Sequence, residues 1–151
     1  MKILYIGFKG KNNTSSQLVN QLGENTLLLT NSFSGLEKDI LSITESYDSI
    51  IMFGVDSSLN GTLIIEKCAE LNGITVSSDY DVAQLSKITD GYGIANNISN
   101  VPTQYLCNAA YYHMLCINKK AVFVHIPSIK GMNDAFMERL QKLFRELSQD
   151  A

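Results

Sequence analysis

Continuous apolar runs alternate along this chain with segments of helical spacing. The runs predict buried strands over residues 2–7, 26–30, 49–54 and 121–127. Apolar positions three or four residues apart predict helices over 15–22, 35–47, 103–118 and 133–148, the first capped by Thr14 or Ser15. Strands that are apolar along their whole length suit a parallel sheet covered by helices on both faces. The pattern predicts a three-layer α/β/α sandwich with a mostly parallel sheet.

The middle of the chain gives a weaker pattern. Residues 62–71 fit either an amphipathic helix ending before Gly73 or a strand, and both alternatives stay open. Residues 77–92 are polar and predict no clear element, while 94–99 predict a further strand. We expect one domain over residues 1–151, with its ligand site at the carboxyl ends of the strands.

Composition narrows the class of protein. The net charge is −3 and the longest basic cluster is Lys119-Lys120, which argues against a nucleic-acid partner. No apolar run is long enough to span a membrane, and the first residues lack a cleavable signal pattern, so we expect a cytoplasmic protein. A homo-oligomer is one alternative that the sequence leaves open.

The three cysteines, Cys68, Cys107 and Cys116, form neither a disulfide framework nor a zinc motif. We therefore expect free thiols, no metal and no cofactor. Pro102 and Thr103 are typical of a helix start, which places Cys107 near the first turn, where the helix dipole favours a thiolate. His125 lies near the carboxyl end of the 121–127 strand, so a thiol and an imidazole could meet there for nucleophilic catalysis. The alternative is a buried Cys and a His that never touch.

Two motifs carry a resemblance to a known family. The segment 99–112 is similar to a Ser-Asn-x-Ala-Gly-Thr-Tyr/Phe-Val-Cys-Asn signature that precedes a helix ending in Tyr. The matching residues are Ser99, Asn100, Tyr105, Cys107, Asn108 and Tyr112. Residues 123–127, Phe-Val-His-Ile-Pro, resemble a second motif of the same proteins. The chain thus resembles a divergent and shortened member of the pyroglutamyl-peptidase (pyrrolidone-carboxylate peptidase) family of cysteine peptidases.

The resemblance implies roles for particular residues. It makes Cys107 the nucleophile and His125 its general base. Glu66, in a segment similar to the family's Glu-Arg-x-Ala, becomes the group that orients the imidazole, with Asp79 as the alternative acid. The implied substrate contacts are Phe8, Asn13 and Asn108, and the implied substrate is a peptide or a small amide.

The chain also departs from the family pattern. The second loop Phe is absent after Phe8, and Val76 stands where the family has an Arg that helps to bind the oxyanion. These losses predict at best weak pyroglutamyl-peptidase activity. The basic loop at 9–12 suggests a larger or more anionic acyl group instead. Two other functions stay open, a non-catalytic relative and a flavodoxin-like module that binds phosphate through the polar loop at 7–16.

Overall fold

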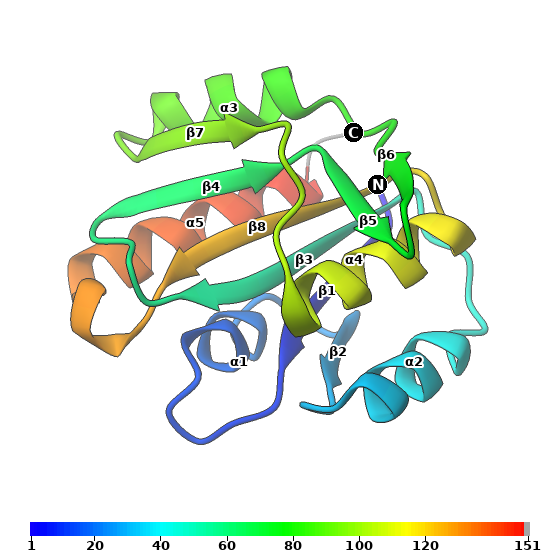
Figure 1. Cartoon of the computed structure of the whole chain (residues 1–151). Helices are drawn as coiled ribbons and strands as arrows, with labels where there is room; N and C mark the ends of the chain where they lie inside the picture. Colours follow the sequence, from blue (N-terminus) through cyan, green and yellow to red (C-terminus); the bar gives the residue numbers. More distant parts are fainter. Residues whose placement is uncertain (150–151) are drawn as a thin grey trace.

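A six-stranded sheet forms the centre of the molecule (Figure 1). The structure, a computed structural model, describes residues 1–149. The strands lie in the order β2-β1-β3-β8-β4-β7. Their bounds are β1 (Ile3–Phe8), β2 (Thr26–Leu29), β3 (Ser49–Asp56), β4 (Thr62–Glu66), β7 (Ala95–Ser99) and β8 (Ala121–Pro127). All neighbouring pairs are parallel except β4 with β8. The predicted mostly parallel α/β fold is confirmed.

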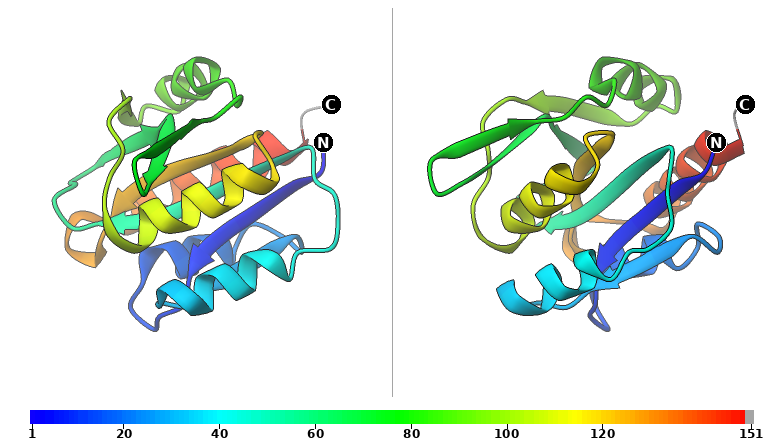
Figure 2. Two further views of the ribbon diagram at one scale, coloured as in Figure 1. Left: turned by 45° about the vertical axis from the view of Figure 1, so that its right-hand side comes forward. Right: turned by 90° about the vertical axis from the view of Figure 1, so that its right-hand side faces the viewer.

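Helices cover both faces of this sheet, as the views in Figure 2 show. Their bounds are α1 (Thr14–Val19), α2 (Phe33–Leu41), α3 (Val82–Gly91), α4 (Tyr105–Ile117) and α5 (Asp134–Gln149), with a short 3₁₀ turn η1 (Ile129–Gly131). Helices α1, α3 and α5 bury apolar side chains in one core cluster, and α2 and α4 do so in a second cluster on the other face. This arrangement gives the three layers.

Strand periodicity decides which side chains face which layer. Along β3, Phe53 belongs to the α1/α5 cluster and Met52 to the α2/α4 cluster, so Gly54 and Asp56 also point to the α2/α4 side. Along β8, Val124 belongs to the first cluster and Phe123 to the second, which places His125 on the α2/α4 side. Polar groups from two adjacent strands therefore meet under α4.

The ambiguous middle of the chain forms strands rather than a helix. β4 ends at Glu66, and the exposed Lys67 separates it from a hairpin of β5 (Cys68–Leu71) and β6 (Ile74–Ser77) that packs beside α4. The polar segment after it contains α3, whose first turn is capped by the Asp81 side chain accepting from the Gln84 N–H.

Helix boundaries differ from the predicted ones for local reasons. Asn13, rather than Thr14 or Ser15, caps α1, because its side chain accepts from two backbone N–H groups of the first turn. Helix α2 is shorter than predicted, since it ends at Leu41. Helix α4 begins at Tyr105, two residues after the predicted start, because Gln104 is still extended and Tyr105 itself has a left-handed φ of 69°. Within residues 1–149, none of the helices is both long and apolar enough to cross a membrane.

Candidate active site

Cys107 and His125 line the same cavity. His125 lies near the end of β8 and pairs in register with Gly54 of β3. Cys107 is the third residue of α4, and its Sγ atom lies 2.8 Å from where a Cβ on Gly54 would stand. The cavity has a volume of about 550 Å³ and opens at the carboxyl ends of β3 and β8. The predicted position of a ligand site in this fold class thus contains both candidate residues of the thiol–imidazole pair.

Glu66 lies behind the imidazole. It ends β4, the strand antiparallel to β8, on the same side of the sheet as His125. Its Oε1 atom is 3.4 Å from His125 Nε2, and both side chains are buried. Tyr111, one helical turn beyond Cys107, donates from its hydroxyl to the Glu66 carbonyl oxygen at 2.8 Å. Helix α4 is therefore attached directly to the strand that supplies the acid.

Burial shifts the pKa values of Cys107 and His125. It raises the pKa of the Cys107 thiol to about 11, with a further rise from the negative charges of Asp56 and Glu66. Burial also lowers the pKa of His125 below its usual range, against the opposing effect of Asp56. At neutral pH the resting pair is a neutral thiol beside a neutral imidazole. Desolvation and the two carboxylates thus oppose the thiolate that the helix dipole alone predicted.

Asp56 is a carboxylate that lines the cavity itself, and the sequence prediction missed it. It ends β3, and its Oδ1 atom accepts from the Ser58 hydroxyl at 2.6 Å and the Ser58 amide at 2.9 Å. These bonds lower the pKa of Asp56, so it is ionised at neutral pH. The available signal was its place at the carboxyl end of a strand, which the predicted strand boundary at Gly54 concealed.

Asp79, the alternative acid, lies away from this cavity. Its backbone amide donates to the Lys119 carbonyl, which precedes β8. Its side chain lines a separate cavity of about 330 Å³ with Asp48 and Lys120, next to the amino ends of β3 and β8. The structure thus brings Glu66, and not Asp79, to His125.

The three predicted substrate contacts have structural partners instead. Phe8 is buried and packs against the ring of Phe123, beneath the cavity. Asn13 caps α1. Asn108 uses both ends of its amide on the backbone of Glu70, which fastens α4 to β5. None of the three lines the cavity of Cys107 and His125.

The polar loop before α1 is not arranged to cradle phosphate. The Asn13 side chain already accepts from the Ser15 and Ser16 amides, which are the donors that an anion would need. The Ser16 hydroxyl donates to the Gly10 carbonyl and closes the loop on itself. These bonds already engage two of the first-turn amides that the flavodoxin-like alternative would need.

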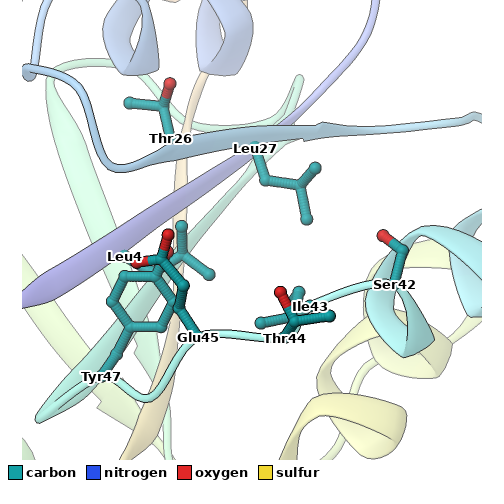
Figure 3. Close-up of a pocket in the computed structure, with 8 residues that line it drawn as sticks. All are labelled: Leu4, Thr26, Leu27, Ser42, Ile43, Thr44, Glu45 and Tyr47. Carbon is teal, nitrogen blue, oxygen red and sulfur yellow. The ribbon is translucent and has the colours of Figure 1, made fainter.

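A second concavity among the described residues lacks a cysteine and a histidine. The hollow drawn in Figure 3 lies between the strands β1 and β2 and the segment that follows α2. Its lining residues are Leu4, Thr26, Leu27, Ser42, Ile43, Thr44, Glu45 and Tyr47, which include no cysteine and no histidine. Across residues 1–149, His, Cys, Asp and Glu side chains form no group of three or more that could hold a metal ion.

The overall fold resembles that of solved structures. No protein-family profile and no curated protein matches the sequence. A mutant pyrrolidone carboxyl peptidase from Pyrococcus furiosus superposes with a TM-score of 0.78 at 19% identity, covering 99% of this chain and 98% of that one. The chain has the fold of the pyrrolidone carboxyl peptidases. The enzyme from Thermococcus litoralis (TM-score 0.73, 18% identity, 99% and 94% covered) shares this pyrrolidone carboxyl peptidase fold. So does the enzyme from Fervidobacterium islandicum AW-1 (TM-score 0.72, 19% identity, 97% and 96% covered).

Replacing Glu66 by Gln is expected to stabilise this pyrrolidone carboxyl peptidase fold at alkaline pH. Burial raises the pKa of Glu66 from 4.5 to about 7, although the Ser99 hydroxyl opposes the shift. The folded state therefore binds more protons than the unfolded state between these values, and the free energy of unfolding falls as pH rises through that window. Glutamine cannot ionise and avoids the loss. At about 1.4 kcal/mol per pKa unit the upper limit is about 3 kcal/mol, and screening reduces it to about 1–2 kcal/mol.

Urea denaturation of the wild type and of the Glu66→Gln variant, between about pH 4 and about pH 8, measures this difference in the free energy of unfolding. Glu70→Gln, an exposed position on β5, is the control and is expected to change stability little at either pH. A Glu66→Gln protein that is less stable than the wild type at alkaline pH would show instead that the ionised pair with His125 holds the fold together.

Proposed function

We propose that this protein is a cysteine amidohydrolase or peptidase in which Cys107 attacks an amide carbonyl and His125 moves the proton. The supporting observation is the shared cavity of these two residues, with the buried carboxyl of Glu66 3.4 Å behind the imidazole. The arrangement of nucleophile, base and orienting acid is the general one for covalent catalysis.

In this mechanism the acylation step begins with neutral partners. His125 accepts the thiol proton as the sulfur of Cys107 bonds to the carbonyl carbon. The tetrahedral intermediate then collapses, the C–N bond breaks, and the imidazolium returns the proton to the leaving amine. Glu66 stabilises the positive imidazolium through its carboxylate and holds the ring in place. A thioester on Cys107 remains.

The start of α4 supplies donors for the oxyanion. Its first turn carries backbone N–H groups without intrahelical partners, and no side chain caps them. They lie next to Cys107, where negative charge develops on the carbonyl oxygen. Hydrolysis of the thioester follows by the reverse sequence. His125 takes a proton from water, the resulting hydroxide attacks, and the carboxylic acid leaves as the thiol is restored.

We expect only weak activity toward pyroglutamyl amides. Val76, at the position of the expected Arg, lies in β6 and packs partly buried against the α2/α4 core cluster. A missing oxyanion donor typically costs on the order of a hundredfold in rate. A missing apolar wall adds a factor of about ten to two hundred. The measurement is turnover of a fluorogenic pyroglutamyl amide beside an authentic pyrrolidone carboxyl peptidase. A rate within about tenfold of that enzyme, a gap of only about 1.4 kcal/mol, would contradict the expectation.

The experiment that tests the proposed function is a panel of fluorogenic aminoacyl, N-acetyl-aminoacyl and pyroglutamyl amides, read together with the masses of the intact protein and of its Cys107 peptide. Turnover with a transient mass increase on the Cys107 peptide is the expected result. The protonated resting thiol favours one alternative, a non-catalytic relative. That alternative predicts no turnover and no acylated intermediate with any member of the panel. A cytoplasmic location belongs to the same proposal, and the free state of the three cysteines supports it.

A further inference from the structure

The cavity above Cys107 carries negative charge and no matching positive charge. Among the described residues that line it, Asp56 is the only group with a formal charge at neutral pH, and there is neither Lys nor Arg. The basic loop that suggested an anionic substrate lies elsewhere, because the Lys9 amine donates to the Thr30 hydroxyl beside β2. An anionic acyl group would therefore meet repulsion at this site.

Asp56 has a free side toward the cavity. Among the described residues, both hydrogen bonds that Asp56 accepts come from Ser58 and end on Oδ1, so Oδ2 has no hydrogen-bond partner there. The side chain points to the same face of β3 as Gly54, against which Cys107 packs. A carboxylate fixed on one oxygen and open on the other is an acceptor for a positively charged donor.

Tyr105 adds an aromatic surface to the same cavity. The residue is 79% exposed and lies at the start of α4, two residues before Cys107. Its φ of 69° lies in the left-handed region, which is unfavourable for a residue with a side chain. Such a conformation persists at functional sites, and an exposed tyrosine face attracts an ammonium group.

We propose that the site selects substrates with a protonated amine next to the scissile carbonyl, that is, amides of amino acids with a free amino terminus, and that Asp56 is the specificity-determining residue. Leu106 supplies an apolar part of the wall that such an acyl group would contact. This inference rests on the proposed amide-hydrolase function for its substrate. The charge preference of the cavity can be measured without turnover.

Charge-selective modification of the thiols tests the charge preference directly. The probes are trimethylammonioethyl methanethiosulfonate, which is cationic, and sulfonatoethyl methanethiosulfonate, which is anionic. In both cases the cysteine sulfur attacks the sulfenyl sulfur, a mixed disulfide forms and methanesulfinate leaves. Cys116, exposed near the end of the same helix, serves as the internal reference and cancels the intrinsic reactivity of each probe.

We expect the Cys107-to-Cys116 rate ratio to be about tenfold higher with the cationic probe than with the anionic one at about 0.1 M salt. Asp56→Asn should reduce this preference about three- to tenfold. Asp48→Asn removes the same charge just before the amino end of β3, and it should leave the probe preference unchanged. High salt should weaken the preference in the wild type.

Turnover provides the second measurement. Asp56→Asn should raise KM for aminoacyl amides about tenfold or more and leave KM for the uncharged N-acetyl analogues nearly unchanged. A lost probe preference in Asp56→Asn without any amide turnover would support the charge selection while contradicting the hydrolase function. An unchanged probe ratio in Asp56→Asn, or an anionic preference in the wild type, would overturn the inference.

Discussion

Replacing Cys107 by Ala is expected to lower kcat on any amide that the wild type hydrolyses by at least about a thousandfold. Removing the nucleophile of a covalent mechanism leaves only binding and oxyanion stabilisation, and such losses range from about 10³ to 10⁶. The neutral resting pair adds a pH signature. Because burial lowers the pKa of His125, kcat/KM should fall at acidic pH as the imidazole becomes protonated and can no longer accept the thiol proton.

Cys116→Ala is the matched control for this variant. Both residues lie on α4, but Cys116 is exposed and nine residues further along the helix. We expect wild-type kcat in Cys116→Ala and an unchanged circular dichroism spectrum in both variants. His125→Gln should match the loss in Cys107→Ala, because the two residues act as one unit. A Cys107→Ala protein that keeps its activity within tenfold would remove the nucleophile assignment.

Gly54→Ala is expected to reduce both activity and stability. An added Cβ would lie 2.6 and 2.7 Å from carbons of the Phe123 ring and 2.8 Å from Cys107 Sγ. β3 lies between β1 and β8 in the sheet, so the backbone cannot retreat easily. The Phe123 ring is buried against Phe8 and Tyr111, which leaves helix α4 to move. A shift of about 1 Å at a reacting group can cost about a hundredfold in rate, and overpacking costs about 1–3 kcal/mol of stability.

Gly91→Ala provides the comparison. Gly91 ends α3, and an added Cβ there meets no atom within 4 Å. We expect this variant to be as active as the wild type and equally stable or slightly more so, because alanine favours helix more than glycine by up to about 1 kcal/mol. Thermal unfolding and kcat/KM of the two variants measured side by side give the result. A Gly54→Ala enzyme with full activity would mean that α4 has room to move above the sheet without losing catalysis.

The elements that sequence predicted best are those with one unambiguous pattern. The strand at 121–127 was predicted with its observed bounds, because seven consecutive residues are buried on both faces. The segment 62–71 could not be resolved, since Lys67 interrupts its pattern where the chain leaves the main sheet for the hairpin. Helix α3 was missed because only Val82, Leu85 and Thr89 are buried on an otherwise polar segment.

For the candidate site, the choice of residues could be predicted from the local sequence, whereas their protonation could not. A predicted helix start and a predicted strand end made Cys107 and His125 a candidate pair, the family resemblance gave them catalytic roles, and a shared cavity contains both. The protonation state of the thiol was not predictable, because it depends on burial and on carboxylates from β3 and β4 that lie far away in sequence. Gly54 was overlooked for the same reason. The absence of its side chain leaves room for Phe123 and Cys107, and these neighbours cannot be identified from a single sequence.

The connection between β3 and β4 carries a consequence for how this fold can change its range of substrates. These two strands are separated by β8 in the sheet, so residues 57–61 must pass over the carboxyl end of β8 (Figure 1). The passage is short and attached at both ends, by the Asp56–Ser58 bonds and by the Gly61 amide donating to the Gly131 carbonyl. Every catalytic candidate sits on a strand or helix outside it. If the proposed hydrolase function holds, insertions or deletions in this connection would change the size of the acyl group that fits the cavity, while Cys107, His125 and Glu66 keep their positions.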